Sequence, residues 1–543
     1  MKICGLWSGH DCSFAILENG MPIIHAEYER YNREKCTPGD SVKFFEDRYE
    51  NASDITVYAS AFPLSKLQKY EGSFSRLIEN TQESNGNLYM FSHHRCHAAN
   101  AFYSSNINDA ITITMDGGGV ESHEGAETAC TIWHGKNNSM NLLKTFMPHE
   151  INIGGVWSRI TRYVFKLQNG WPYGGQEGTI MAMAALGNSQ KYHDDFFKML
   201  TSDIIPAGMK PSDQPIGPTS DRDPRHPYLE PWAAIARVSE QDKFDLAAGL
   251  QSATEQVIRS IIKYAIGLSP ETKNICLSGG VVLNSVAMGK IKEWFPNIEE
   301  VYIPPVPYDA GLSIGAAQIV WHEVMKNPRI SWKDNFTPYL GERWTRDHFN
   351  SIIEDKPVNT QEATVEDVIS LLEDGNIVCV FNEGSESGRR ALGNRSILAD
   401  PRNKDMKDII NKKVKHRQWF RPFAPSILQE SGEEWFENYQ HSPYMQFVLK
   451  FKKDKLEKVP AVVHFDGTAR LQTVSKNDNS WYYGFLKKWE EKTGVPIILN
   501  TSFNDREPIC ENVDHAISCF LGTEIDFLFF PEYNVLISKK GEK

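Results

Sequence analysis

Two histidines and two aspartates have the residue types and spacing of metal ligands. His93 and His97 lie four positions apart in residues 92–102, a segment predicted to be helical, so both imidazoles lie on one helix face. Asp116 and Asp309 follow apolar strands in glycine-containing loops and complete a His₂Asp₂ set. Such a set suits Fe(II), our preferred ion, or Mn(II) or Zn(II), acting as a Lewis acid. The alternative is an ordinary histidine pair and an aspartate that only caps a turn.

A polar turn near the N-terminus contains a histidine and an aspartate. His10 and Asp11 lie in the turn between two predicted strands. An imidazole with a pKa near neutrality can take the proton of a hydroxyl that attacks a carbonyl. An ordinary turn histidine would look the same in the sequence, so both interpretations stay open.

Loops in the last third of the chain contain a high density of basic residues. Arg389 and Arg390 lie in a loop rich in Gly and Ser, and Lys415, Arg417 and Arg421 precede the run Pro-Phe-Ala-Pro. Arginine offers a planar fork for bidentate phosphate contacts, and lysine offers a point charge. We therefore predict that this region holds ATP together with a second phosphorylated anion. A nucleic-acid patch is the alternative, and the acidic chain and the embedded prolines disfavour it.

Composition restricts the class of protein. With 543 residues, 41% hydrophobic and 24% charged, the chain suits a globular protein of two or three domains. The formal charge of −12 argues against nonspecific nucleic-acid binding, which needs basic surface. No run approaches the roughly eighteen apolar residues of a membrane span, and the N-terminus lacks a signal-peptide core. The nine cysteines are widely spaced without a CxxC pair, which is typical of reduced thiols and predicts a cytoplasmic protein.

The elements that must position these residues are those of an α/β protein. Strands are predicted at 3–7, 12–18 and 21–27, with polar tight turns between them, and at 111–115 and 274–277 before glycine-rich turns. Ligands in α/β sheets bind at the carboxyl ends of strands, because loops there present backbone N–H groups and side chains together.

A second domain is indicated by a fresh start of helix and strand signals. Thr364 is a predicted N-cap, with Asp367 three residues later in the capping-box position. We place the boundary at 335–355, which gives domains of 1–345 and 346–543.

Six motifs follow one another along the chain. They are His-His-x-x-His with the later Asp-Gly-Gly-Gly, and then the segments 278–284, 308–317, 386–396, 464–472 and 499–504. Together they resemble the NodU/CmcH-type O-carbamoyltransferases of nodulation-factor, cephem and tobramycin biosynthesis. Within 386–396 the family has Phe and Pro where this chain has Ser387 and Arg389, and the sequence does not tell what these departures change.

The resemblance implies a fold and a set of site residues. The first domain is expected to have the duplicated actin-like, sugar-kinase-like α/β fold, and the second a YrdC-like α/β fold. By resemblance the four ligands named above bind the metal, and Gly279, Gly280 and Asn284 line the nucleotide end of the first domain. The residues implied to bind carbamoyl phosphate and ATP are Arg390, Lys415, Arg417, Arg421, Arg470, Asn500, Ser502 and Asn504.

The implied reaction has two steps. The second domain makes carbamoyl-adenylate and pyrophosphate from carbamoyl phosphate and ATP with Mg²⁺, with Arg390 and Lys415 as catalytic residues. The first domain then transfers the carbamoyl group to a hydroxyl of a small-molecule acceptor, with help from His10 or Asp11. Because carbamoyl-adenylate hydrolyses readily, an enclosed path between the two sites is expected.

Other functions fit parts of the same pattern. A tRNA threonylcarbamoyl-transfer enzyme shares both domain types, but the negative charge and the motif order disfavour it. A sugar-kinase-like phosphotransferase would leave the second domain unexplained. A hydrogenase-maturation protein would need segments that this chain lacks. A noncatalytic binding protein descended from the enzymes would not need candidate residues at every motif, and this chain has them.

The sequence does not identify the acceptor. Its pocket is expected to be built by the segments 40–90, 120–175 and 200–235, the last of which contains a surface loop at 207–228 rich in Pro, Asp and Gly. Oligomeric state is equally open, with a homodimer as one option.

Overall fold

The computed structural model divides the chain into two compact units. Unit 1 comprises Met1–Ala287 and Ile291–Phe336, and unit 2 comprises Met288–Lys290 and Thr337–Lys543. The residues that the structure describes are 1–61, 71–83, 86–121, 127–167, 175–201, 229–332 and 336–541. The predicted surface loop at 207–228 lies outside the described residues, as do parts of the three segments predicted to bind the acceptor.

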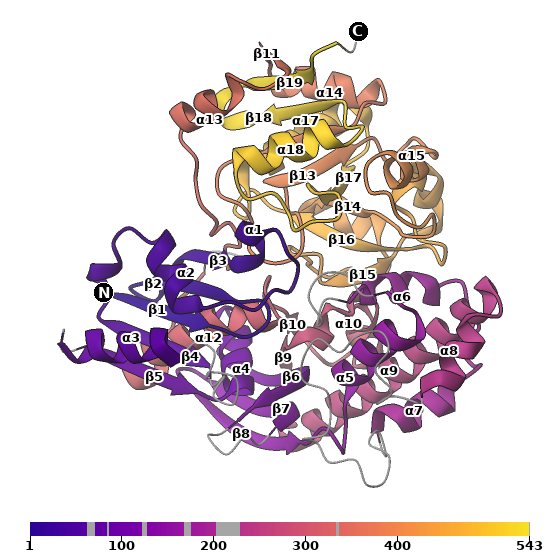
Figure 1. Ribbon diagram of the computed structural model, residues 1–543. Helices are drawn as coiled ribbons and strands as arrows, with labels where there is room; N and C mark the ends of the chain where they lie inside the picture. Colours follow the sequence, from indigo (N-terminus) through magenta and orange to yellow (C-terminus); the bar gives the residue numbers. More distant parts are fainter. Residues whose placement is uncertain are drawn as a thin grey trace. The chain divides into compact units, whose positions relative to one another are not determined.

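The described strands of unit 1 form two five-stranded sheets with the same strand order (Figure 1). The first sheet, β3-β2-β1-β4-β5, consists of β1 Lys2–Trp7, β2 Ser13–Glu18, β3 Met21–Glu27, β4 Val57–Ala61 and β5 Asn87–Phe91. The second, β10-β9-β6-β7-β8, consists of β6 Asp109–Val120, β7 Glu127–Lys136, β8 Ser139–Phe146, β9 Asn274–Ser278 and β10 Glu300–Tyr302.

Strand directions repeat as well as strand order. In each sheet the first three strands form an antiparallel meander, and the last two run parallel to the first strand on its other side. The duplicated α/β fold predicted for this region is confirmed by this repeat. The predicted strands at 3–7, 12–18, 21–27 and 274–277 agree with the observed ones to within one residue at either end.

The strand that carries Asp116 differs from the prediction. The sequence predicts a strand that ends at Met115, whereas β6 continues to Val120, and its pairing with β7 shifts register between Met115 and Gly119. Asp116 therefore lies in an irregular part of the strand and not in a loop beyond it. An irregularity of this kind can re-aim a side chain without ending the strand.

Two buried helices pack between the sheets of unit 1. The helix α4, His93–Tyr103, packs on β6 and β9, and α12, Leu312–Ile319, packs on β1, β2 and β4. The two helices also pack against each other. A Cβ at Gly315 would lie 1.9 Å from the carbonyl oxygen of Cys96, so only glycine permits this approach. The helix that carries His93 and His97 is thus held firmly on both sides.

Further helices of unit 1 surround these layers. They are α1 Tyr28–Asn32, α2 Ser41–Arg48, α3 Glu71–Glu83, α5 Ile153–Arg159, α6 Glu177–Ala184, α7 His193–Thr201, α8 Glu230–Ala236, α9 Glu240–Leu268 and α11 Ile291–Trp294. A short helix, α10 Ser285–Gly289, follows the motif at 278–284.

The described part of unit 2 is built on one mixed nine-stranded sheet of order β11-β19-β18-β12-β13-β17-β14-β16-β15. Its strands are β11 Val358–Glu362, β12 Val378–Phe381, β13 Arg395–Ala399, β14 Ala424–Leu428, β15 Phe447–Lys450, β16 Thr468–Val474, β17 Ile497–Ser502, β18 Phe527–Phe530 and β19 Val535–Lys539. Its helices are α13 Arg346–Ile353, α14 Val365–Glu373, α15 Met406–Lys413, α16 Gly432–Trp435, α17 Ser480–Thr493 and α18 Val513–Gly522.

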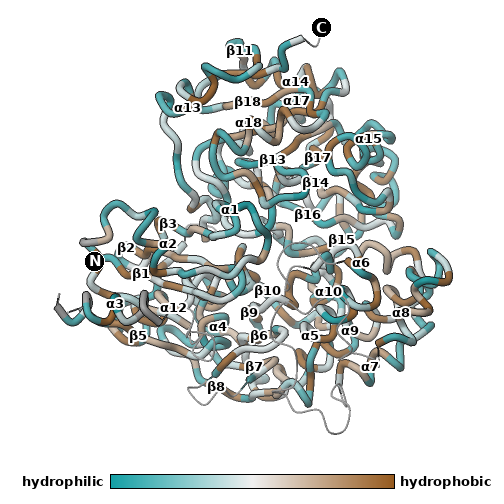
Figure 2. Tube along the Cα trace, in the orientation of Figure 1, coloured by the Kyte–Doolittle hydropathy of each residue, from teal (hydrophilic) through white to brown (hydrophobic). Residues whose placement is uncertain are grey.

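A large apolar cluster joins helices α14 and α17 to this sheet. Figure 2 shows hydrophobic residues along both helices, and Leu372 and Trp489 are completely buried in this cluster. Helix α14 starts at the predicted capping box, because Thr364 Oγ1 accepts from the N–H of Asp367 and the Asp367 carboxylate accepts from the N–H of Thr364. The local prediction at the start of this helix is confirmed.

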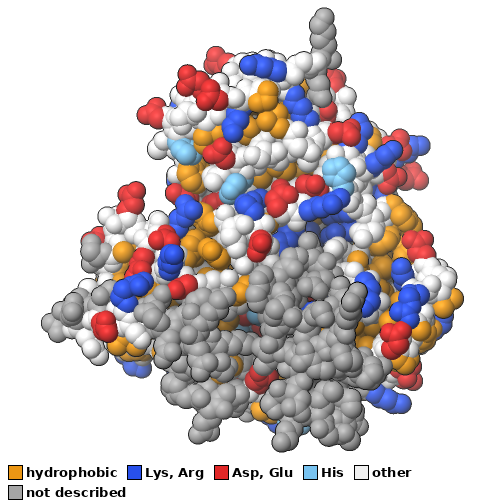
Figure 3. Space-filling model, viewed as in Figure 1, with side chains coloured by type: hydrophobic (Ala, Val, Ile, Leu, Met, Phe, Trp, Pro, Cys, Tyr) orange, Lys and Arg blue, Asp and Glu red, His pale blue; other side chains and the backbone are white. Residues whose placement is uncertain are grey.

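Charges and thiols are distributed in a simple way. On the face in Figure 3, basic and acidic side chains are interspersed over the described surface. All nine cysteines lie within the described residues and are buried, and no disulfide joins them. Within the described ranges, no helix combines the length and the apolar character that crossing a bilayer requires.

Candidate metal centre and anion cluster

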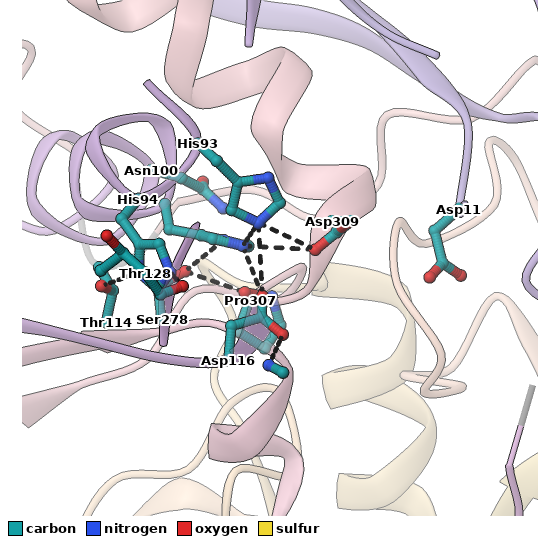
Figure 4. Close-up of polar contacts among 12 residues, drawn as sticks. Asp11, His93, His94, Asn100, Thr114, Asp116, Thr128, Ser278, Pro307 and Asp309 are labelled. Atoms are coloured by element: carbon teal, nitrogen blue, oxygen red, sulfur yellow. Dashed lines mark hydrogen bonds and ion pairs between the residues drawn. The ribbon is translucent and has the colours of Figure 1, made fainter. Parts of the chain in front are cut away.

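Three elements of unit 1 direct four side chains at one point. His93 and His97 are one turn apart at the start of α4, Asp116 projects from the irregular part of β6, and Asp309 opens the short turn that leads into α12. In Figure 4, His93, Asp116 and Asp309 point toward one another, whereas Asp11 lies to one side. The structure therefore brings together the residues that the sequence nominates as metal ligands.

Short distances join these four side chains. His97 Nε2 lies 3.1 Å from His93 Nε2 and 2.9 Å from an Asp116 carboxylate oxygen. An Asp309 oxygen lies 3.5 Å from His93 Nε2 and 3.4 Å from His97 Nε2. One donor atom from each of the four residues lies within 4.8 Å of the others. Nitrogen and carboxylate donors this close fit a divalent transition metal.

A hydroxyl orients the His97 ring for that role. The Ser278 hydroxyl donates to the carbonyl oxygen of Pro307 at 2.9 Å and lies 3.4 Å from His97 Nδ1. Because its proton is used on Pro307, the hydroxyl oxygen faces the ring as an acceptor, and Nδ1 carries a proton. Nε2 is then the ring nitrogen that faces the centre, as in histidines that bind metals through one ring nitrogen.

The charges of the cluster compensate one another. Burial lowers the pKa of His97, but hydrogen bonds and charge from Asp116 and Asp309 outweigh it and raise the pKa to about 9. Burial raises the pKa of Asp116, but hydrogen bonds and charge from His93 and His97 outweigh it and hold this pKa well below the usual range. The cluster therefore keeps the Asp116 carboxylate ionised, which suits a site for a cation.

The third histidine of the motif has a different role. His94 Nδ1 lies 2.5 Å from the Thr114 hydroxyl, and Nε2 lies 2.8 Å from the carbonyl oxygen of Thr128. Burial, followed by the charges of His93 and His97, lowers the pKa of His94 to about 3. A neutral His94 ties α4 to strands β6 and β7 and supports the two predicted ligands.

His10 lies next to the four-residue cluster. Its Nδ1 is 2.9 Å from an Asp11 oxygen, and its Nε2 is 3.2 Å from an Asp309 oxygen. Burial lowers the pKa of His10, but Asp309 and then Asp11 outweigh it and raise the pKa to about 9. The ring is therefore oriented by two carboxylates, an arrangement that suits proton transfer at the edge of the cluster.

The predicted nucleotide end of unit 1 is formed by backbone turns and an amide pair. Gly279 has a φ of +96°, and a Cβ there would lie 2.1 Å from the carbonyl oxygen of Met115, so only glycine fits. A Cβ at Gly280 would lie 3.3 Å from an Asp116 oxygen. The side chain of Asn284 makes a reciprocal pair with Gln251, with N–O distances of 2.8 and 3.1 Å. Ligand binding by these residues stays a prediction.

In unit 2, four arginines come together from three segments. Arg390 lies in the loop between β12 and β13, Arg417 and Arg421 lie in the loop between α15 and β14, and Arg470 lies in β16. Burial, then the positive charges of the other three arginines, holds the pKa of Arg470 well below its ordinary value. Burial also lowers the pKa of Arg421 to about 10.

Three of these arginines have no carboxylate partner within the described ranges. Among the described residues, none forms an ion pair with Arg417, Arg421 or Arg470. The Nε of Arg470 is buried without a hydrogen-bond partner. Burying unpaired cationic groups is unfavourable, so the positions of Arg417, Arg421 and Arg470 suit an anionic ligand.

Lys415 contacts the loop that follows β17. Its Nζ donates to the carbonyl oxygens of Ser502 and Asn504, both at 2.6 Å, and to Asn504 Oδ1 at 2.8 Å. The Ser502 hydroxyl also donates to Asn504 Oδ1, at 2.7 Å. Three predicted ligand-binding residues are thus brought together, with the ammonium group directed at this loop. A phosphate contact by Lys415 stays a prediction.

Asn500 lies in the interior of unit 2. Its side chain is 0% exposed, and its Nδ2 donates to the carbonyl oxygen of Ala391 at 3.1 Å and to Gln472 Oε1 at 2.9 Å. The resemblance implies that Asn500 binds the nucleotide, and in the structure its amide holds the backbone next to Arg390. Nucleotide binding by Asn500 stays a prediction.

Two buried charged residues escaped the sequence reasoning. The Glu386 carboxylate accepts from the N–H groups of Leu392 and Asn394, at 2.5 and 3.2 Å. The Arg395 guanidinium donates to the carbonyl oxygen of Asn382 at 2.6 Å and lies 3.5 Å from the centre of the Phe381 ring. Both fix the loop that carries Arg390. A charged residue at the start of the apolar run Ser-Ile-Leu-Ala was the available signal.

Two family models match the chain. "Carbamoyltransferase N-terminus" matches residues 66–318, and "Carbamoyltransferase C-terminus" matches residues 369–538. The structure of HypF from T. kodakarensis aligns with 60% of this chain and 48% of that chain at 13% identity, with a TM-score of 0.37. That score is too low to support a conclusion about fold or function.

Curated relatives agree with the family models. Nodulation protein NolNO of Sinorhizobium fredii is 31% identical over 570 residues, which cover 98% of this chain and 79% of that protein. The uncharacterized protein sll1178 of Synechocystis is 32% identical over 482 residues, which cover 81% of this chain and 75% of that protein. Both halves of the chain are matched, and the relatives exceed 30% identity over most of their length. The chain therefore belongs to the carbamoyltransferase family of enzymes.

Proposed function

We propose that this chain is an ATP-dependent O-carbamoyltransferase that activates the carbamoyl group in unit 2 and transfers it to a hydroxyl of a small-molecule acceptor in unit 1. The main support is that the two units contain opposite kinds of site. One is a cluster of arginines, three of which have no carboxylate partner among the described residues, and the other is a set of two histidines and two aspartates around one point. The first suits phosphates and the second suits a cation.

The activation step balances when water takes part. Carbamoyl phosphate and water give carbamate and phosphate, and a carbamate oxygen then attacks the α-phosphorus of ATP. Carbamoyl-adenylate forms as the bond to pyrophosphate breaks. The four guanidinium groups neutralise the charge that builds up between the reacting phosphates, and Mg²⁺ accompanies the nucleotide. Lys415 keeps the Ser502–Asn504 loop in place beside them.

The transfer step uses the residues around α4. His93, His97, Asp116 and Asp309 would hold the divalent metal, with Fe(II) as our choice over Mn(II) and Zn(II), and the metal would supply Lewis acidity toward oxygen atoms of the intermediate. In its neutral form, His10, held between Asp11 and Asp309, takes the proton of the acceptor hydroxyl. The hydroxyl oxygen attacks the carbamoyl carbon, and AMP leaves.

Two substitutions test the division between the units. Arg390→Ala abolishes the carbamoyl-phosphate-dependent exchange of labelled pyrophosphate into ATP, because a guanidinium of the shared anion site is removed. His97→Ala leaves exchange intact and blocks carbamoyl transfer, measured as the mass gain of the acceptor.

The matched control for the first variant is Arg402→Ala in the same unit. Arg402 pairs with Asp400 at 2.7 Å, so its charge is already balanced and exchange should persist. Normal exchange in Arg390→Ala, or loss of both activities in a folded His97→Ala protein, would contradict the proposal.

A further inference from the structure

Two exposed aromatic rings lie beside the arginine cluster of unit 2. Trp419 and Phe465 are each 50% exposed. Their ring centroids are 5.5 Å apart, and the ring planes meet at 84°, so the pair is edge to face. Large apolar side chains gain free energy by burial. A pair of rings kept in contact with each other at the surface therefore needs an explanation.

The sheet places the two rings side by side. Trp419 lies in the loop that enters β14, and Phe465 lies in the turn that enters β16. These strands are parallel neighbours, with Ser426 opposite Gln472. Segments that enter adjacent parallel strands lie at the same end of those strands. The two rings therefore meet although they are far apart in the sequence.

The loop that carries Trp419 is held in a fixed conformation. Arg417 Nε donates to Asn411 Oδ1 at 2.7 Å, and Asn411 Nδ2 donates to the carbonyl oxygen of Arg421 at 3.0 Å. Asn411 of α15 thus ties both sides of the loop. Trp419 lies two residues from each of these arginines, so the backbone that carries its indole has a set position relative to the arginine cluster.

The turn that carries Phe465 is fixed as well, and it leads to Arg470. The N–H of His464 donates to the carbonyl oxygen of Thr468 at 2.8 Å. Lys407 Nζ lies 4.5 Å from the centre of the Phe465 ring. Burial lowers the pKa of His464 to about 4; Asp466 opposes this, while Arg470 and Lys407 add to it. The turn, the lysine and the arginine are therefore close neighbours.

We infer that Trp419 and Phe465 form the platform on which the base of the nucleotide stacks while the arginine cluster holds its phosphates. The inference rests on the proposed adenylation in unit 2. Aromatic side chains stack on bases, and a purine offers the larger ring. Two rings are too small an area for a stable protein partner, whereas the adjacent guanidinium groups of Arg417 and Arg421, which form no ion pair within the described part of the chain, match the phosphates of the same ligand.

The first test measures the KM for ATP in carbamoyl-phosphate-dependent pyrophosphate exchange. Trp419→Ala raises this KM by about 10-fold, as expected for loss of one base–aromatic stack, and Phe465→Ala raises it by a smaller factor. Trp419→Phe restores most of the loss. Inhibition by tripolyphosphate, which has no base, is unchanged in all three variants. Tyr264→Ala, which truncates another exposed ring (47%) on α9, leaves the KM unchanged.

The second test locates the base without any turnover. Photolabelling with 8-azido-ATP and peptide mapping should place the label within 415–423 or 463–468, and tripolyphosphate should compete with it. Labelling there in a protein without exchange activity would keep the platform and refute the proposed function. Labelling elsewhere only, or a loss of tripolyphosphate inhibition equal to the loss of ATP affinity in Trp419→Ala, would refute the platform.

Discussion

The four-residue cluster of unit 1 and the arginine cluster of unit 2 both bury ionisable side chains, but they balance charge in opposite ways. Around α4, carboxylates face imidazoles, which raises the pKa of His97 to about 9 and keeps that of Asp116 well below its usual range. In unit 2, guanidinium groups face one another, and burial, followed by repulsion from neighbouring arginines, lowers the pKa values of Arg470 and Arg417.

This difference bears on stability as well as on ligand choice. The first cluster contains attractive pairs, so it holds its geometry without a ligand. The second contains like charges, so it is unfavourable until an anion binds, and binding should stabilise the unit strongly. Substitutions in the arginine cluster are therefore expected to reduce activity without reducing the stability of the ligand-free protein. Substitutions in the four-residue cluster of unit 1 are expected to reduce both more nearly together.

The largest expected effect comes from Arg470. Arg470→Met removes an unpaired buried cation but keeps its apolar stem, so exchange falls by at least about 100-fold while the ligand-free protein is as stable as before or more stable by about 1 kcal/mol. Exchange assays and thermal unfolding measure the two quantities. A stability loss as large as that of a core truncation would show that Arg470 is structural and would remove the contrast between the units.

Asp116→Asn tests the other side of the comparison. Loss of one carboxylate should reduce the bound transition metal, measured by mass spectrometry of the purified protein, and should lower carbamoyl transfer by about 100-fold or more, with exchange unchanged. Asp109→Asn is the matched control on the same strand, since Asp109 is 42% exposed and pairs with His134. Metal content equal to that of the unsubstituted protein would contradict the assigned ligand set.

Acid should destabilise unit 2 through His464. Its folded-state pKa of about 4 is below the ordinary value of about 6.5, so between these values the unfolded state binds more protons. Stability therefore falls as the pH drops from about 6.5 to about 4 and changes no further through this group below that. His464→Gln should make the melting temperature less dependent on pH in this window. An unchanged slope would mean that burial and the nearby positive charges do not lower the pKa of this imidazole in the folded protein.

The smallest expected effect is at the start of α14. Thr364→Ala removes the N-cap hydrogen bond and should cost about 1 kcal/mol of the free energy of unfolding, with exchange and transfer unchanged. Denaturant titration measures the loss. A change in the rate of pyrophosphate exchange would show that the start of α14 affects the arginine cluster, although no charge is altered there.

Local chemistry was predictable because it depends on neighbours in the chain. The spacing of His93 and His97 places both rings on one face of α4, and the capping box at Thr364 involves residues three apart. The Asp116 prediction was less accurate: the residue was correct, but its place within β6 depends on pairing with β7, which residue order does not reveal.

Long-range packing decided which groups several residues contact. Asn500 is implied to be a ligand residue by its motif, and only the sheet order shows that its strand, β17, lies between β13 and β14, where its amide donates to the carbonyl oxygen of Ala391. Likewise Trp419 and Phe465 looked like parts of two separate motifs, and only the neighbouring positions of β14 and β16 bring their rings together.

By itself, the sequence determined the family, the residue types at both sites, and the elements that carry them, because spacing along a helix or strand follows from backbone geometry alone. Only the tertiary structure decided which charges are balanced and which are not. That balance depends on the distances between segments dozens of residues apart, and those distances are set by sheet order and by the close contact of α4 with α12.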